Sequence, residues 1–309
     1  MTALDQQSAT TSIDPATEMG VVALSVANLD RSLAFYTDAM GFAVLQRTGT
    51  GAVLGVAGSP LLVLTEQRGA LPWLTDGMTG LYHFAILVPT RAALGRWLRH
   101  YLSLSFPPPG QGDHIVSEAL YLRDPDGHGI EVYRDRPREG WRWTNGQVQM
   151  GAGPVDLRGI LAEAGDTGQP WAGLAAGTKV GHVHLQVGDI PEAAAFYHGV
   201  LGFDIVAQMP SALFVSAGGY HHHLGMNTWH SQGAAPASGD TARLLWYTIA
   251  LPSEEARAAV VGRLTAAGIA HEQRDGIVTG RDPWQNAILL HVGPLPDALA
   301  AAALADRSR

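Results

Sequence analysis

The sequence contains no cysteine among its 309 residues. This absence excludes disulfides, cysteine-ligated zinc sites, iron–sulfur clusters and a thiol nucleophile. A bound metal would therefore need ligands from the 13 histidines or from the carboxylates. Basic residues are also few, because 20 Lys and Arg stand against 28 Asp and Glu, which gives a formal net charge of −8. That balance argues against a nucleic-acid partner, which would require a basic surface stripe.

The chain also lacks the sequence signals of membrane insertion and export. No apolar run approaches the length of a membrane span, and the polar residues 1–17 lack the basic and apolar regions of a signal peptide. Hydrophobic residues make up 46% of the chain and charged residues 16%, which is typical of a globular protein. We therefore expect a cytoplasmic protein with no membrane partner, and a homo-oligomer remains an open alternative.

The sequence repeats itself at a constant offset of 161 residues. Residues 22–46 resemble residues 183–208, so that Phe35 and Tyr36 correspond to Phe196 and Tyr197. A weaker similarity relates residues 121–133 to residues 279–291, and a third relates residues 86–90 to residues 249–253. Each half of the chain therefore contains two related units, which predicts four units in all.

Each unit has the pattern of a strand, a helix and three shorter strands. An alternating apolar stretch comes first, and the following helix has Asp, Thr or Ser near its start, as suits an N-cap. The expected first strands are residues 21–26, 81–88, 182–187 and 244–251, and the expected helices are residues 30–40, 90–102, 191–201 and 253–267. The predicted fold class is therefore α+β, with four βαβββ modules forming two open, barrel-like β domains.

The domain boundaries follow from this pattern. We expect a disordered tail over residues 1–18, the first pair of modules over 19–134, a connector over 135–178, the second pair over 179–292 and a C-terminal tail over 293–309. The connector has a short helical run at residues 155–164. It is predicted to be ordered because Trp141, Trp143 and Trp171 favour burial.

Histidines and one glutamate occupy corresponding positions in different units. His83 and His182 lie on first strands, whereas Glu131 and the histidine run 221–223 lie near last strands. A lone histidine on an apolar strand is usually a satisfied core residue, but an inward glutamate is unfavourable unless it is paired or binds a cation. Pairing units one with two, or three with four, separates these side chains, whereas pairing two with three gathers them. Only the last arrangement supplies two histidines and a carboxylate, the set found in non-haem Fe(II) oxygenases.

Residues 19–292 resemble the vicinal-oxygen-chelate superfamily, which includes glyoxalases, bleomycin resistance proteins and type I extradiol dioxygenases. The AFY motif followed by GF is typical of the superfamily. Three stretches are similar to catechol-2,3-dioxygenase-like enzymes: YLRDPDGHGIE, in which Tyr121 precedes Glu131 by ten residues, then GHVHLQV and HHLGM. The resemblance implies that His83, Glu131 and His182 are the metal ligands.

The resemblance also implies catalytic roles for three other side chains. His222 would be the acid–base residue and would need a pKa near its ordinary value, and Tyr121 would donate a hydrogen bond to the substrate. The family places a second active-site histidine nine residues before the tyrosine, where this chain has Gly112, so His114 is the expected substitute. The ligand order also departs from that of common extradiol enzymes, whose ligands come from units three and four.

The implied activity is cleavage of a small aromatic diol by O₂. The implied cofactor is Fe(II), with Mn(II) as the alternative because both metals accept these ligands. A glyoxalase-like isomerase or lyase, with a fourth ligand from residues 221–223, is one rival function. A non-enzymatic binding protein like the bleomycin resistance proteins is another. His184, His221 or His223 could also replace an assigned histidine.

Overall fold

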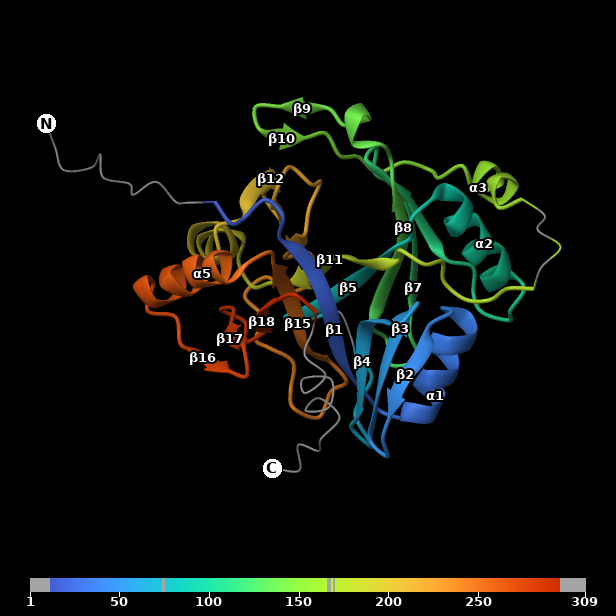
Figure 1. Cartoon of the computed structure of the whole chain (residues 1–309), viewed down its shortest axis with the longest axis horizontal. Coiled ribbons are helices and arrows are strands. Elements are labelled where there is room, and N and C mark those ends of the chain that lie inside the picture. The colour runs from blue at the N-terminus through green and yellow to red at the C-terminus, as the bar shows by residue number, and fades with distance from the viewer. Residues whose placement is uncertain (1–11, 74–75, 166–167, 169, 295–309) are drawn as a thin grey trace, which may run out of the picture.

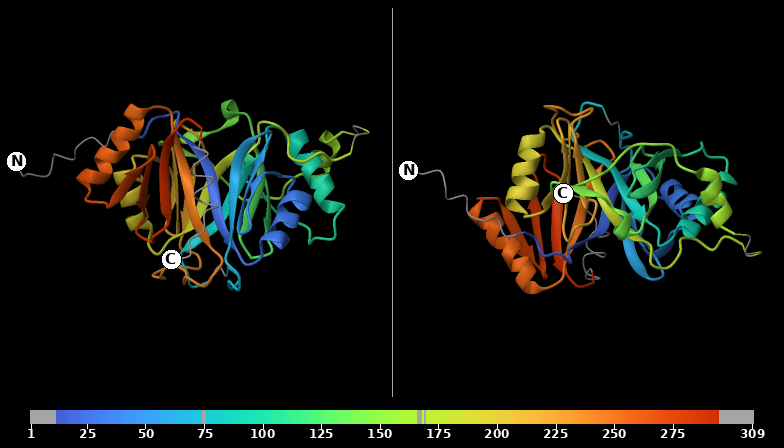
Figure 2. Two further views of the ribbon diagram at one scale, coloured as in Figure 1. Left: turned by 60° about the horizontal axis from the view of Figure 1, so that its bottom comes forward. Right: turned by 90° about the horizontal axis from the view of Figure 1, so that it is seen from above.

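The computed structural model describes residues 12–73, 76–165, 168 and 170–294. Its centre consists of two eight-stranded sheets, and the helices α2, α3 and α5 lie toward the two ends of the molecule (Figure 1; further views in Figure 2). The α+β architecture built from four βαβββ units is confirmed. Among the described residues, no helix is long and apolar enough to cross a membrane.

The four units have the following elements. Unit one contains β1 (Glu18–Val26), α1 (Leu29–Ala34), β2 (Ala43–Arg47), β3 (Gly51–Val56) and β4 (Ser59–Glu66). Unit two contains β5 (Gly80–Leu87), α2 (Arg91–Leu102), β6 (Gly110–Asp113), β7 (Ser117–Arg123) and β8 (Gly129–Asp135). Unit three contains β11 (Lys179–Gln186), α4 (Ile190–Ala194), β12 (Asp204–Met209), β13 (Ala212–Ser216) and β14 (Leu224–Asn227). Unit four contains β15 (Leu244–Leu251), α5 (Glu254–Ala266), β16 (His271–Arg274), β17 (Ile277–Arg281) and β18 (Ala287–Val292).

Each sheet joins one unit from each half of the chain. The first sheet has the order β16-β17-β18-β15-β1-β4-β3-β2, so it joins units four and one. The second has the order β12-β13-β14-β11-β5-β8-β7-β6, so it joins units three and two through the antiparallel pair β5 and β11. This is the pairing that the metal-ligand hypothesis requires.

The helix starts follow the expected capping chemistry with one shift. Thr90 and Ser253 are N-caps whose side chains accept backbone N–H groups, as predicted. The first helix begins earlier than expected, because its N-cap is Asn28 rather than Asp30. The helices of units one and three each end in a π-helical turn, Phe35–Ala39 and Ala195–Val200.

The repeated tyrosine of the AFY motif has a structural role. The Tyr36 hydroxyl donates to Asp124 at 2.9 Å, and the corresponding Tyr197 hydroxyl donates to Asp282 at 2.8 Å. Both tyrosines are fully buried, and each bond joins a helix of one unit to the loop before the last strand of the next unit. Units one and two lie in different sheets, and so do units three and four, so these two bonds connect the sheets to each other.

The connector is ordered in its described part. It forms β9 (Trp143–Thr144), β10 (Gln147–Val148) and α3 (Leu157–Glu163), close to the expected helical run. Trp141 is buried and Trp171 is half-buried, but Trp143 is 41% exposed, so the prediction of its burial was wrong. Trp143 lies on a separate two-stranded hairpin that no layer covers, which explains its exposure.

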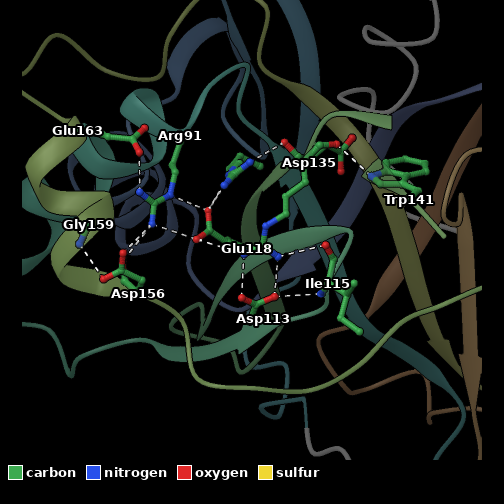
Figure 3. A network of polar contacts seen from close by, with 11 residues as sticks. Arg91, Asp113, Ile115, Glu118, Asp135, Trp141, Asp156, Gly159 and Glu163 are labelled. Atoms are coloured by element: carbon green, nitrogen blue, oxygen red, sulfur yellow. Dashed lines mark hydrogen bonds and ion pairs between the residues drawn. The ribbon is translucent and has the colours of Figure 1, made fainter. Parts of the chain in front are cut away.

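A buried charge network fixes the connector against unit two (Figure 3). Arg91 binds Glu118 in β7 and reaches Asp156 and Glu163 around α3, with its Nη1 2.6 Å from the carboxylate of Glu163. The Arg134 Nε donates to the same Glu118 carboxylate at 2.6 Å. Glu118 is 2% exposed, so the centre of the network lies inside the protein, whereas Asp156 and Glu163 lie at its surface.

The ordered chain starts earlier than predicted. Residues 1–11 of the expected disordered tail lie outside the described residues, but Ile13 is buried and its N–H donates to the Gly202 carbonyl at 2.7 Å. Strand β1 begins at Glu18. The expected tail over residues 1–18 was therefore too long, because an apolar residue near its end packs against unit three. Residues 295–309 of the expected C-terminal tail lie outside the described residues.

Candidate metal centre

Three predicted ligands converge on neighbouring strands of the second sheet. His83 lies on β5, Glu131 on β8 and His182 on β11, and all three are buried. The Nε2 atoms of His83 and His182 lie 3.0 and 3.1 Å from the Glu131 Oε2, and 3.3 Å from each other. Among the described residues, these are the only three side chains whose potential ligand atoms gather in this way.

The spacing of the three atoms fits a divalent metal ion. Ligands on one face of an octahedron with bonds of about 2.1 Å are about 3.0 Å apart, whereas a pair on opposite sides would be about 4.2 Å apart. The three observed separations of 3.0–3.3 Å are close to the shorter value, so the three atoms could lie on one face of such an ion, with the opposite side free for other ligands. Two imidazoles and one carboxylate are also the donor types that such metals accept.

The protonation states of His83 and Glu131 suit a metal. Burial lowers the pKa of His83, which favours the neutral imidazole, although the Glu131 carboxylate opposes this effect. Burial alone would raise the pKa of Glu131, but His182 and His83 outweigh it and hold the pKa well below its ordinary value. The site thus presents an anionic carboxylate and a neutral His83 imidazole.

The Glu131 contact at Nε2 and packing around the ring together orient His182. Its Nδ1 is buried without a hydrogen-bond partner among the described residues. The ring lies between Tyr133 and His222, with centroid separations of 4.9 and 4.2 Å. The neighbouring Gly181 is required here, because a Cβ at this position would lie 1.8 Å from the Tyr133 hydroxyl.

The centre forms one wall of a large apolar cavity of about 660 Å³. Aromatic and methionine side chains line much of it, together with the connector segment around Gly151. The principal lining residues beyond the ligands are Tyr82, Val116, Leu122, Met150, Met209, Phe214 and Trp229. Of the predicted catalytic side chains, His114, Tyr121 and His222 all line the same cavity.

Two of the predicted catalytic residues, His114 and Tyr121, contact each other directly. The His114 Nε2 lies 2.5 Å from the Tyr121 hydroxyl, and its Nδ1 lies 2.8 Å from the Gly151 carbonyl. Since a carbonyl only accepts, a neutral His114 carries its proton on Nδ1 and accepts the Tyr121 proton at Nε2. A Cβ on Gly112 would lie 2.8 Å from the His114 Nε2. The His114 ring thus fills the space beside Gly112, which fits its expected role as the substitute.

The histidine run lies in the segment before β14 rather than on the strand itself, contrary to the expectation for His222. All three rings are buried. Burial lowers the pKa of His222 well below its ordinary value and lowers the pKa of His223 to about 3. The expectation that His222 keeps an ordinary pKa was therefore wrong for the metal-free protein, because the sequence did not indicate the depth of its burial.

The alternative histidines are engaged elsewhere. The His184 Nε2 lies 3.0 Å from the side-chain amide of Asn227, and the His223 Nδ1 accepts the Ala217 N–H at 3.1 Å. Neither belongs to the converging group around Glu131.

Sequence reasoning missed Asp135, which lies 2.9 Å from the His221 Nε2. The strand alternation Glu131, Tyr133, Asp135 could have placed it on the face of the predicted ligand.

Comparisons with known proteins agree with this fold. The family model described as Glyoxalase/Bleomycin resistance protein/Dioxygenase superfamily matches residues 18–132 and 179–287. The chain is 43% identical over 290 residues to the Catechol-2,3-dioxygenase of Bacillus subtilis (strain 168), covering 91% of this chain and 99% of the relative. It is 34% identical over 110 residues to the Biphenyl-2,3-diol 1,2-dioxygenase 3 of Rhodococcus globerulus, covering 33% of this chain and 56% of that one.

A solved structure supports the fold. The crystal structure of glyoxalase I from Zea mays aligns with a TM-score of 0.56 at 16% identity and covers 95% of this chain and 98% of that chain. The family model accounts for more than half of the residues, and the first relative extends over almost the whole length of both proteins. The chain therefore belongs to the glyoxalase/bleomycin resistance protein/dioxygenase superfamily.

Proposed function

We propose that this protein is an extradiol ring-cleavage dioxygenase that uses Fe(II) to cleave a catechol-type diol with O₂. The observation that carries the proposal is the facial set of His83, Glu131 and His182 at the wall of an apolar cavity. The near full-length similarity to a catechol-2,3-dioxygenase supports the same reaction. In this reaction the ring bond beside the diol breaks and both oxygen atoms of O₂ enter the product, so no external reductant is required.

His83, Glu131 and His182 would hold the iron. When bound, Fe(II) would supply the Lewis acidity and the electron transfer between diol and O₂ that ring cleavage needs. Mn(II) accepts the same ligand types and is the alternative metal.

Three side chains of the cavity would handle protons and orient the substrate. His222 lies against the His182 ring and would take a proton from the diol and return one later. In the free protein the Tyr121 hydroxyl donates its hydrogen bond to the His114 Nε2. With substrate bound, the hydroxyl would donate to a substrate oxygen instead. If the His114 Nε2 were protonated, it could no longer accept this hydrogen bond, and the Tyr121 hydroxyl would be available to the substrate. The protonation of His114 would thus control the hydrogen bond of Tyr121.

The size of the cavity favours a substituted ring. About 660 Å³ is more than a single diol ring fills, and Met209, Phe214 and Trp229 give the remaining space an apolar lining. We therefore expect alkyl or aryl catechols to bind at least as well as catechol itself.

The function is tested by anaerobic reconstitution with Fe(II) followed by addition of catechol or 4-methylcatechol and O₂. A yellow ring-fission product and uptake of one O₂ per diol are expected. Colourless product absorbing only in the ultraviolet, or turnover of a thiol–aldehyde adduct with Zn(II) and no oxygen uptake, would contradict the proposal. The Glu118→Ala variant is not a suitable control because we expect the loss of this buried carboxylate to destabilise the protein; Glu163→Gln, on the exposed side of the same network, is expected to keep full activity.

A further inference from the structure

His222 is hydrogen-bonded to a second histidine, His221, which in turn is bonded to the Asp135 carboxylate. The Nδ1 atoms of His222 and His221 are 2.8 Å apart, and the His221 Nε2 is 2.9 Å from the Asp135 Oδ1. His221 is 1% exposed, so water does not compete for these bonds. Neither His221 nor Asp135 lines the substrate cavity, whereas His222 does.

The two contacts specify where the protons lie. A carboxylate only accepts, so the His221 Nε2 carries a proton and donates it to Asp135. A neutral His221 then has a bare Nδ1, which accepts the proton on the His222 Nδ1. The His222 Nε2 is then unprotonated and carries a free lone pair. A histidine in this tautomer can accept a proton at Nε2.

We propose that Asp135 and His221 are positioning residues that fix His222 in the tautomer with a proton on Nδ1 and a free Nε2. The proposal rests on the acid–base role proposed for His222. Without Asp135, His221 could place its proton on either nitrogen, and the bond to His222 could reverse. The pair would then present a protonated Nε2 to the cavity, which cannot take a proton from the diol.

Asp135 lies outside the substrate cavity. It lines a separate cavity of about 210 Å³ together with Glu18, Arg138, Lys179 and Tyr220. Burial raises the pKa of Tyr220 well above its ordinary value, and the charge of Asp135 adds to the effect. The Asp135 side chain is 23% exposed, so it keeps contact with solvent while its partner His221 is sealed. The orientation of His222 is thus set from a face that the substrate does not reach.

The tautomer can be measured without turnover. Long-range ¹H–¹⁵N correlation spectra of histidine-labelled full chain, loaded with Zn(II) as a diamagnetic ion, distinguish the two ring nitrogens. The His222 signals are identified by their absence from His222→Gln. We expect a protonated Nδ1 and a bare Nε2 in the wild type, and a mixed or reversed pattern in Asp135→Ala. A protonated Nε2 in the wild type, or an unchanged pattern in Asp135→Ala, would overturn the proposal.

Glu18→Ala is the matched control for this spectrum. Glu18 lines the same small cavity and binds Lys179 at 2.7 Å, and in the described part of the chain it forms no hydrogen bond or ion pair with His221 or His222. The His222 pattern should stay as in the wild type. A change of equal size in both variants would show that any loss of charge in the cavity disturbs His222, and the specific role of Asp135 would be refuted.

Kinetics and chemical rescue provide a second readout with the Fe(II) enzyme. We expect Asp135→Ala to lower kcat by about 10- to 100-fold, as for other residues that orient a catalytic ligand, while KM changes less than about threefold. In His221→Ala, imidazole should restore part of kcat because it offers both a donor and an acceptor nitrogen, whereas N-methylimidazole should not. Equal rescue by both, or an unchanged kcat in Asp135→Ala, would overturn the proposal.

The two proposals fail in different ways. If the wild type forms no ring-fission product but His222 shows the expected tautomer, the proposed reaction is wrong and the positioning role stands. If ring fission occurs but the tautomer is reversed, the positioning role is wrong and the reaction stands.

Discussion

Replacement of Glu118 by glutamine should destabilise the protein without touching the metal centre. The Glu118 carboxylate is 2% exposed and accepts hydrogen bonds from the Nε atoms of Arg91 at 2.8 Å and Arg134 at 2.6 Å, with the Arg136 Nη2 3.6 Å away (Figure 3). Guanidinium groups only donate, so the amide NH₂ of a glutamine would face other donors. The variant therefore loses a charge and gains an unfavourable contact at unchanged volume.

The size of the effect follows from burial. Removal of one partner from a buried ion pair typically costs about 3–5 kcal/mol. The three arginine side chains are 14–30% exposed, so water would stabilise them partly once the carboxylate is gone. We therefore expect the free energy of unfolding to fall by about 2–4 kcal/mol, which is less than for a fully buried ion pair. Urea unfolding at pH 7, followed by tryptophan fluorescence, measures it.

A matched control and a pH series make this prediction specific. Glu163 binds the same Arg91 but is 51% exposed, so Glu163→Gln should change stability by no more than about 1 kcal/mol. Burial would raise the pKa of Glu118, but Arg91 and Arg134 outweigh it and lower the pKa. The carboxylate therefore stabilises the protein fully above its unfolded pKa of about 4.3, and this stabilisation is lost as the pH falls through the lower folded value.

The reasoning would be refuted by either of two results. One is a loss in Glu118→Gln no larger than in Glu163→Gln. The other is a difference from wild type that stays constant when the pH is lowered well below 4, where protonation should make the two side chains alike.

Three further predictions concern the site and its surroundings. His83→Ala and Glu131→Ala should each weaken Fe(II) binding more than about 100-fold, measured as metal per chain after dialysis, and full metal content in either variant would refute the ligand assignment. Trp229→Ala should raise KM about 5- to 30-fold for an alkylcatechol and less for catechol, since apolar contact is lost only with the substituent; equal shifts would contradict this. The bond from Arg136 lowers the pKa of Asp113 to about 2, so Asp113→Asn should lower the melting temperature at pH 7, and the difference should shrink as the pH falls from 4 toward 2; a difference as large at pH 2 as at pH 7 would count against it.

The internal repeat determined most of the fold. Apolar alternation and the capping residues Thr90 and Ser253 predicted the strands and helices, because these signals depend on neighbours along the chain. Alternation also placed His83 and Glu131 on an inward face. These predictions depend only on residues near each other in the sequence, so they do not require knowledge of how distant segments pack.

The position of His114 shows a limit of pattern matching. The family pattern expects a histidine where Gly112 stands, and the sequence could only suggest a neighbour as substitute. The structure shows the His114 ring in the space beside Gly112 and against Tyr121. A change of two positions along an irregular segment can thus be absorbed by the direction of a side chain, which spacing does not encode.

The sequence by itself determined which side chains could bind a metal, because residue type and strand alternation fix their chemistry and their face. It could not determine that units two and three pair, since His83 and His182 are 99 residues apart and strand pairing between them depends on packing of the whole chain. Only the tertiary structure decided this pairing, the burial of the run 221–223, and the contact of Asp135 with His221, because each arises where distant segments meet.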